Sequence, residues 1–198
     1  LLGSSPDVQT VLDKIRDARH VYFIGCGTSY HACLAGSVFF ARLAGRAAIP
    51  VIAPQFVPQY LPAVDSRDVG VFVSQSGETK DVLNALHAAE ERGMTCFGLA
   101  NVIGSTLTKQ TACWLPLCCG YEISVPATKT FTNQVVTFLY LAYRLAGKDT
   151  SELNNIPQWM DETLDMTAPQ IEAIVPEINA WNDLYCLGYG LTYPIALE

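Results

Sequence analysis

The sequence predicts one α/β domain in which helices cover both faces of a mainly parallel sheet, giving three layers (αβα). Short apolar runs rich in β-forming residues alternate with longer segments whose apolar residues recur at helical spacing. The chain has 198 residues, which is room for about one domain. Half of it is hydrophobic and its mean hydropathy is +0.22, so it has enough apolar area to bury a core.

Residues 7–52 are expected to form two helix–strand pairs. Each helix has apolar residues along one face, and each strand is a short apolar run bounded by Gly or Pro. In chain order we expect a helix over 7–18, a strand over 20–24, a helix over 29–44 and a strand over 49–52. Ser29 is expected to cap the second helix and Gly45 to end it.

Residues 69–146 continue the alternation. In chain order we expect a strand over 69–73, a helix over 78–92, strands over 95–99 and 114–117, and a helix over 128–146. The turn-rich segment 101–106 separates the last two strands. Strands that alternate with helices in this way favour parallel pairing through helical crossovers.

The first domain is expected to span residues 1–147. Residues 148–183 have a helical pattern without a strand and predict a helical connector interrupted by its prolines (Pro157, Pro169 and Pro176). Residues 184–197 then repeat the pattern of 21–34, with glycines in equivalent places (Gly25 and Gly188, Gly27 and Gly190). We therefore expect the truncated start of a second, similar domain over 184–198, and a longer natural protein.

Composition disfavours several classes of partner. Twelve Lys and Arg against 19 Asp and Glu give a formal net charge of −7, which disfavours DNA, RNA and anionic membrane surfaces. No apolar stretch approaches the roughly 20 residues of a membrane span, and no secretory signal is visible. The seven cysteines lack disulfide or zinc spacing, which predicts reduced thiols and a cytoplasmic protein.

Two turns between a strand and a helix carry the candidate site residues. The first turn has the hydroxyls of Thr28 and Ser29 as side-chain donors. The second turn has the hydroxyls of Ser74, Ser76 and Thr79 and the side-chain amide of Gln75. In a parallel sheet both turns would leave the carboxyl edge, where helix N-termini favour an anion. The donors suit a phosphate monoester held without Lys or Arg; the alternative is that they only cap helices and satisfy turns.

Other site motifs do not fit. Tyr30 stands where a dinucleotide-binding fingerprint needs its third glycine, and the chain has no Gly-Lys-Ser/Thr loop for a nucleoside triphosphate. Ser74 occupies the position at which a serine-hydrolase elbow needs glycine. The histidines are expected to be structural or solvated, with His31 nearest to the first turn. No His, Cys or carboxylate cluster has ligand spacing, so we expect no metal and no cofactor.

Four motifs of the chain resemble the sugar isomerase (SIS) domain family. They are Gly25–His31, Ser74–Thr79, Asn101–Thr106 and Glu122–Thr132, and together they cover about residues 20–146. Residues 184–198 resemble the opening of that family's second SIS domain. The resemblance implies a flavodoxin-like sheet, a phosphosugar ligand and a homodimer.

The resemblance also implies roles for single residues, which are Thr28, Ser29, Ser74, Gln75, Ser76, Thr79 and Val125. The hydroxyls of the second turn would hold the phosphate, with the Gln75 amide beside them. Those of the first turn would lie against phosphate and sugar, and the Val125 backbone would contact the sugar. The catalytic groups would lie beyond Glu198, so this chain alone is expected to be inactive.

One departure from the family pattern leaves the substrate open. Family members usually read Val-Ala-Ser-Thr-Lys where this chain reads Val125-Pro-Ala-Thr-Lys129, so a hydroxyl is missing at Ala127. The leading hypothesis is the first half of an aldose–ketose isomerase or aminotransferase that acts on a hexose 6-phosphate. The alternatives are a non-catalytic phosphosugar sensor, a deglycase or deaminase of an amino-sugar phosphate, and a fragment that serves only dimer packing.

Overall fold

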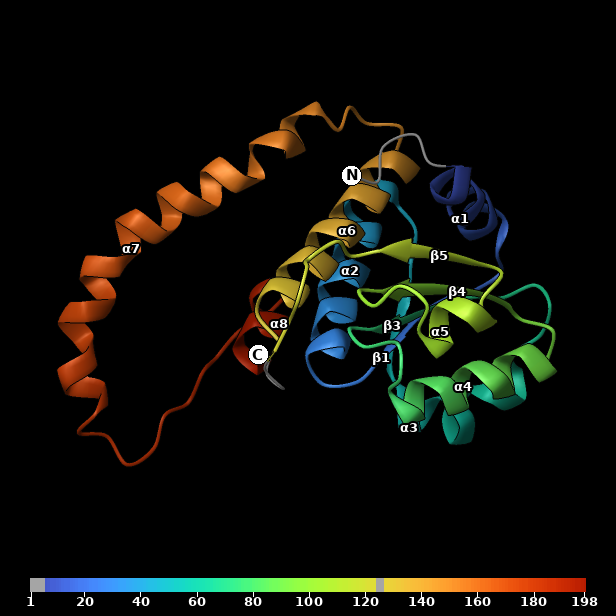
Figure 1. Ribbon diagram of the computed structural model, residues 1–198, viewed down its shortest axis with the longest axis horizontal. Coiled ribbons are helices and arrows are strands. Elements are labelled where there is room, and N and C mark those ends of the chain that lie inside the picture. Colours follow the sequence, from blue (N-terminus) through green and yellow to red (C-terminus); the bar gives the residue numbers. More distant parts are fainter. Residues whose placement is uncertain (1–5, 124–126) are drawn as a thin grey trace.

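A five-stranded parallel sheet lies at the centre of the chain, with helices on both of its faces (Figure 1). The computed structural model describes residues 6–123 and 127–198. The strands are β1 (Val21–Gly25), β2 (Ile49–Ile52), β3 (Val69–Ser74), β4 (Thr95–Ala100) and β5 (Cys113–Pro116). Their spatial order is β2-β1-β3-β4-β5 and every neighbouring pair is parallel. This is the flavodoxin-like order, so the predicted three-layer fold is confirmed.

Successive residues of the central strands pack into opposite layers. One face is covered by α1 (Pro6–Asp17), α2 (Thr28–Ala44) and α6 (Lys129–Leu145). The other is covered by residues 53–63, α4 (Lys80–Glu91) and α5 (Thr106–Gln110). In β1, Val21 and Phe23 belong to the first core, and Tyr22 and Ile24 belong to the second. Because β1 is buried on both faces, its sequence is continuously apolar rather than alternating.

Residues 53–63 form short helical pieces that the sequence did not predict. They are α3 (Ala53–Gln55), a π-helical turn over Phe56–Tyr60 and a 3-10 turn over Leu61–Ala63. Prolines at 54, 58 and 62 obscure any helical pattern, since proline usually marks a loop. Phe56 is fully buried, so this segment helps to close the second core.

The connector was expected to break at its prolines, and that expectation is wrong for two of them. After a 3-10 turn (Ser151–Asn155), α7 runs from Ile156 to Ile178 with Pro169 and Pro176 inside it. The helix extends away from the sheet (Figure 1), and none of its residues is buried, so water can satisfy the carbonyl groups that the prolines leave unpaired. No helix of the described ranges has the length and hydropathy of a membrane span.

The segment after α7 differs from the strand–turn–helix that its sequence predicts. No strand forms over 184–187, although α8 (Thr192–Leu197) follows and packs against α2. A strand needs a neighbour to pair its backbone groups, and none of the described residues supplies one here. Tyr185 and Leu187 are correspondingly exposed.

The glycine turn itself does repeat. Gly27 and Gly190 both have positive φ, 50° and 58°. A Cβ added at Gly25 would lie 2.9 Å from the backbone carbon of Ser29, and one at Gly188 would lie 2.6 Å from that of Thr192. In both turns the first glycine is required by the close approach of the following helix.

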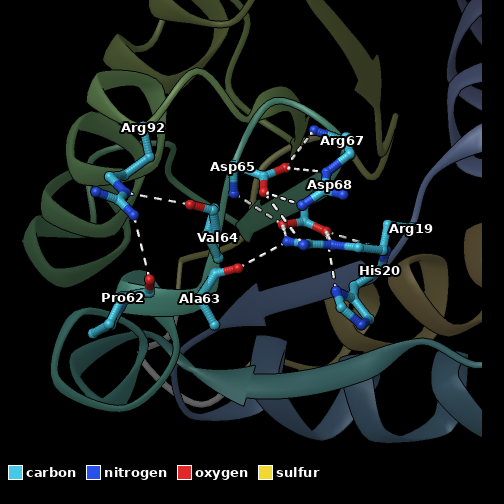
Figure 2. Close-up of polar contacts among 9 residues, drawn as sticks. All are labelled: Arg19, His20, Pro62, Ala63, Val64, Asp65, Arg67, Asp68 and Arg92. Carbon is cyan, nitrogen blue, oxygen red and sulfur yellow. Dashed lines mark hydrogen bonds and ion pairs between the residues drawn. The ribbon is translucent and has the colours of Figure 1, made fainter.

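A charged network at the amino edge of the sheet joins the start of β1 to the start of β3 (Figure 2). Asp68 is fully buried. It accepts hydrogen bonds from Arg19 Nε at 3.0 Å, Arg19 Nη2 at 2.6 Å, the His20 amide at 3.2 Å and the Asp65 amide at 3.0 Å. Burial alone would raise the pKa of Asp68, but the Arg19 guanidinium and the Asp65 amide lower it below its ordinary value. This network lies at the edge opposite the candidate site, so we assign it to stability.

Candidate functional site

The two predicted turns leave the same edge of the sheet from neighbouring strands. In the parallel register of β1 and β3, Ile24 lies opposite Phe72, so both strands point their carboxyl ends the same way. The chain then continues into α2 on one face and into α4 on the other. Adjacent strands whose helices diverge in this way open a crevice, which is the usual ligand position in such sheets.

Hydroxyl groups organise the second turn. Ser74 is buried; its Oγ accepts a hydrogen bond from the Gly77 amide at 3.0 Å and lies 2.8 Å from Oγ1 of Thr79. Ser76 is half-buried, and its Oγ accepts a hydrogen bond from the Glu78 amide at 3.1 Å. Because that bond uses only a lone pair of Ser76, its O–H stays available as a donor to a ligand.

Gly77 holds this turn against the neighbouring loop. It has a positive φ of 68°, and a Cβ at this position would lie 2.0 Å from Oγ of Ser105. Its carbonyl accepts a hydrogen bond from the Leu107 amide at 3.0 Å. Glycine therefore provides both the backbone conformation and the space that the close approach requires.

The acidic residue of the second turn, Glu78, contacts the start of α5. The Glu78 carboxylate accepts hydrogen bonds from the amide and the hydroxyl of Thr106, both at 2.7 Å, at the start of α5. The hydrogen bond from the Thr106 amide lowers the pKa of Glu78 most, and the hydrogen bond from the Thr106 hydroxyl lowers it further. Glu78 thus stays ionised as a cap of α5.

The first turn differs from its prediction at Ser29. The helix α2 begins at Thr28, so Gly27 takes the N-cap position and Ser29 lies inside the first turn. Ser29 is 7% exposed, and its Oγ accepts a hydrogen bond from Nε2 of Gln134 at 3.0 Å. The hydroxyl contacts another helix instead of capping its own, because that neighbour provides a buried donor.

A carboxylate that the sequence analysis did not include lies beside the first turn. Thr28 Oγ1 donates to Glu198 Oε1 at 2.9 Å, and His31 Nδ1 lies 2.7 Å from Glu198 Oε2. Residues 170 positions apart give no spacing signal, so only the packing of α8 on α2 shows this contact. Thr28 must exchange this partner before its hydroxyl can reach a ligand.

Both helices at the crevice present uncapped N-termini. The residue at the N-cap position makes no side-chain capping hydrogen bond in either helix; it is Gly27 for α2 and Thr79 for α4. Thr79, at the N-cap position of α4, instead lies against Ser74. The partial positive charge at each helix N-terminus therefore favours a bound anion. In α2 the amides of Ser29 and Tyr30 already donate to the carbonyls of Cys26 and Gly27, at 3.1 and 2.8 Å.

The other two motifs of the resemblance support these turns. The Asn101 amide donates to the Gln75 carbonyl at 3.1 Å, while its side chain bonds the amide of Cys119 at 3.0 Å and the carbonyl of Gly120 at 2.7 Å. The Glu122 carboxylate accepts hydrogen bonds from the Thr130 amide at 2.9 Å and the Thr130 hydroxyl at 3.1 Å, at the start of α6. The sequence analysis gave these residues no role, because their partners lie outside the local pattern, 8 positions away for Glu122 and 18 and 19 positions away for the Asn101 side chain.

One expected contact at the crevice falls on a residue that the structure does not describe. Val125 lies outside the described residues, so its predicted contact with the sugar stays a prediction. A cavity of about 720 Å³ lies elsewhere, between β5, α6 and the start of α7, and contains no residue of either turn. Within 6–123 and 127–198, no three His, Cys, Asp or Glu side chains form a metal-binding group.

Comparison with known proteins gives the family. A family model described as "SIS domain" matches residues 14–144, which is more than half of the chain. The chain belongs to the SIS domain family. The structure of a phosphosugar isomerase from Silicibacter pomeroyi matches this SIS chain with a TM-score of 0.80 and 28% identity, over 96% of this chain and 58% of that one. Glucosamine-6-phosphate deaminase from Thermotoga maritima matches with a TM-score of 0.72 and 27% identity, over 82% and 50%.

Sequence relatives of this SIS chain are longer proteins. Glutamine–fructose-6-phosphate aminotransferase of Pyrobaculum aerophilum is 37% identical over an aligned length of 198 residues, and the alignment covers 96% of this chain and 33% of the relative. The chain thus spans about a third of the length of the curated relatives it matches.

Proposed function

We propose that this SIS domain binds a hexose 6-phosphate in the crevice between β1 and β3. The observation that carries the proposal is the meeting of two hydroxyl-bearing turns, each opening an uncapped helix, at one edge of the sheet. The relatives support it, since their names include a fructose 6-phosphate aminotransferase and a phosphosugar isomerase. In the whole protein we propose an aldose–ketose isomerase or aminotransferase.

The second turn is proposed to hold the phosphate. A phosphate dianion presents three terminal oxygens, and charge-assisted hydrogen bonds contribute about 1.5–3 kcal/mol each. Ser76 has a free O–H, and the hydroxyls of Ser74 and Thr79 lie 2.8 Å apart. The side-chain amide of Gln75, which stands between Ser74 and Ser76 in the sequence, is proposed as a further donor. Surface charge opposes this binding only weakly, because salt screens charges beyond roughly 8 Å.

The first turn and the Val125 backbone are proposed to face the sugar. Thr28 and Ser29 are the first residues of α2, which follows β1, and β1 is the strand next to β3. Both residues therefore start from the side of the crevice that β1 forms. Their roles are to orient the sugar rather than to transfer protons. The acid and base groups of the reaction are proposed to come from outside this chain, which by itself binds without turnover.

A second substrate class is favoured by one observation. The matching structure from Thermotoga maritima is named a glucosamine-6-phosphate deaminase. An amino-sugar phosphate is therefore the alternative ligand. Competition between fructose 6-phosphate and glucosamine 6-phosphate for the same site distinguishes the two.

The domain arrangement is part of the same proposal. We propose an SIS domain over 1–147, a connector over 148–183 and a second SIS-like domain that starts near residue 184. The repeated glycine turn at Gly188 and Gly190 supports this arrangement. Exposed apolar side chains along α7, such as Leu164 and Ile171, support burial against another domain or a second subunit of a homodimer.

The seven free cysteines support a cytoplasmic location.

Ser76→Ala tests the phosphate assignment. The variant is expected to weaken binding of fructose 6-phosphate about tenfold or more, because one charge-assisted hydrogen bond is lost. Isothermal titration of the chain and its variant measures the change. Ser37→Ala is the matched control, since the Ser37 hydroxyl bonds the Leu34 carbonyl of its own helix at 2.8 Å. Equal affinity of the Ser76→Ala variant and the unmodified chain would refute the role of Ser76.

A further inference from the structure

Gln134 of α6 is a fully buried amide that contacts the candidate site through one atom pair. Its Nε2 donates to Ser29 Oγ at 3.0 Å, across 105 positions of sequence. Its Oε1 has no hydrogen-bond partner among the described residues. A buried amide with an unpaired oxygen is less favourable than an apolar side chain of similar size, so packing alone does not account for glutamine at this position.

Tight helix packing fixes where this amide lies. The helices α2 and α6 run side by side on one face of the sheet (Figure 1). A Cβ added at Gly36 would lie 2.6 Å from Cγ of Phe138, so the two helices approach closely at this point. Gln134 lies one turn before Phe138 on α6, and both side chains are fully buried. The amide therefore has little freedom to turn away from Ser29.

The direction of the hydrogen bond determines what Ser29 can do. A serine hydroxyl has one proton to donate and two lone pairs that accept. The bond from Gln134 uses a lone pair, so the Ser29 proton is free to be donated. Ser29 retains a small exposed area and Gln134 has none, so Ser29 lies between the buried amide and the surface of the turn.

We propose that Gln134 is a positioning residue that orients the Ser29 hydroxyl as a donor to the bound hexose phosphate. This role rests on the proposed function, because it requires the ligand to lie in the crevice. It predicts that Gln134 affects affinity only through Ser29. A glutamine that merely stabilised the helix pair would change the melting temperature and leave the affinity for the ligand unchanged.

A double-mutant cycle with fructose 6-phosphate as the probe tests this role. Ser29→Ala and Gln134→Met are each expected to weaken binding about five- to tenfold, as for one lost hydrogen bond. Methionine has a similar volume and satisfies the apolar surroundings, so the variant is expected to fold. The double variant is expected to bind no more weakly than Ser29→Ala alone. Isothermal titration gives the four dissociation constants, and thermal unfolding reports folding separately.

A charged variant gives an independent readout. In the Gln134→Glu variant an ionised carboxylate can only accept, so it takes the Ser29 proton away from the ligand. A protonated carboxyl group at this position can donate to Ser29 as the amide does. The affinity of the Gln134→Glu variant, relative to that of the unmodified chain at the same pH, is therefore expected to recover as the pH falls. Thr137→Val, at a buried polar position on the same helix, is the matched control and is expected to leave the affinity unchanged.

The outcomes separate this role from the proposed function. If the unmodified chain does not bind fructose 6-phosphate, both are wrong. If it binds, and the Gln134→Met variant binds equally well or adds its full effect to that of Ser29→Ala, the proposed function stands and the positioning role is refuted.

Discussion

Replacing Asp68 by alanine is expected to lower the free energy of unfolding by about 3 kcal/mol, because several hydrogen bonds to a fully buried carboxylate are lost. The His20 and Asp65 amides would also lose their acceptor. For a chain of this size the melting temperature would fall by roughly 6–12 °C. Thermal unfolding followed by circular dichroism measures the change.

Asp65→Ala is the matched control for that variant. Asp65 is a partly exposed aspartate three residues earlier, and its carboxylate pairs with Arg67 at 2.7 Å and, less closely, with Arg19 at 3.3 Å. Exposed ion pairs contribute little, so only a small shift in melting temperature is expected. If Asp68→Ala were as mild as Asp65→Ala, the network of Figure 2 would not hold the amino edge of the sheet together.

The same carboxylate predicts how stability depends on pH. The folded pKa of Asp68 lies below its unfolded value, so its contribution is complete above the unfolded pKa of about 3.9. The contribution is lost as the pH falls through the folded pKa. Below about pH 4, the difference in melting temperature between the unmodified chain and the Asp68→Asn variant is therefore expected to shrink.

Gly77→Ala is expected to destabilise the chain by about 3 kcal/mol and to abolish phosphosugar binding. The new Cβ would lie 2.0 Å from Ser105 Oγ and 2.6 Å from Ser105 Cβ, and Ser105 is itself buried. Overpacking costs about 1–3 kcal/mol, and a positive φ adds about 1–2 kcal/mol for a residue with a Cβ. Because Gly77 positions the Ser74–Thr79 turn, relief of the clash would displace that turn.

Two further variants separate the two costs at Gly77. Gly104→Ala carries only the conformational cost, since Gly104 has a φ of 81° and nothing lies within 4 Å of an added Cβ. Adding Ser105→Gly to Gly77→Ala removes the clash and is expected to restore about half of the lost stability. Equal effects of Gly77→Ala and Gly104→Ala would show that the close approach to Ser105 is not present.

The sheet was predictable because burial on both faces leaves a plain mark in the sequence. β1 and β3 are continuous apolar runs bounded by glycines or polar turns, and all five strands were expected within one or two residues of their observed bounds. Patterns failed where the environment decided the conformation. Proline at 169 and 176 continues a helix because α7 is surrounded by solvent, and residues 184–187 form no strand because no neighbour pairs with them.

The candidate site was predictable only in part, for a similar reason. Ser74 ends β3 and Ser76 follows two residues later, so their place at the sheet edge follows from topology. Gln134 and Glu198 reach the first turn from helices more than 100 positions away. Such contacts depend on how α6 and α8 pack against α2, which no local pattern specifies.

The central claim is that the crevice between β1 and β3 recognises an esterified phosphate. Isothermal titration of the 198-residue chain with fructose 6-phosphate and with fructose, at one pH and one salt concentration, tests it directly. The claim predicts saturable binding of one fructose 6-phosphate per chain and at least 100-fold weaker binding of fructose. The difference is expected because fructose lacks the phosphate, so two or more charge-assisted hydrogen bonds are missing. Equal affinity for the two sugars, or binding of neither, would contradict it.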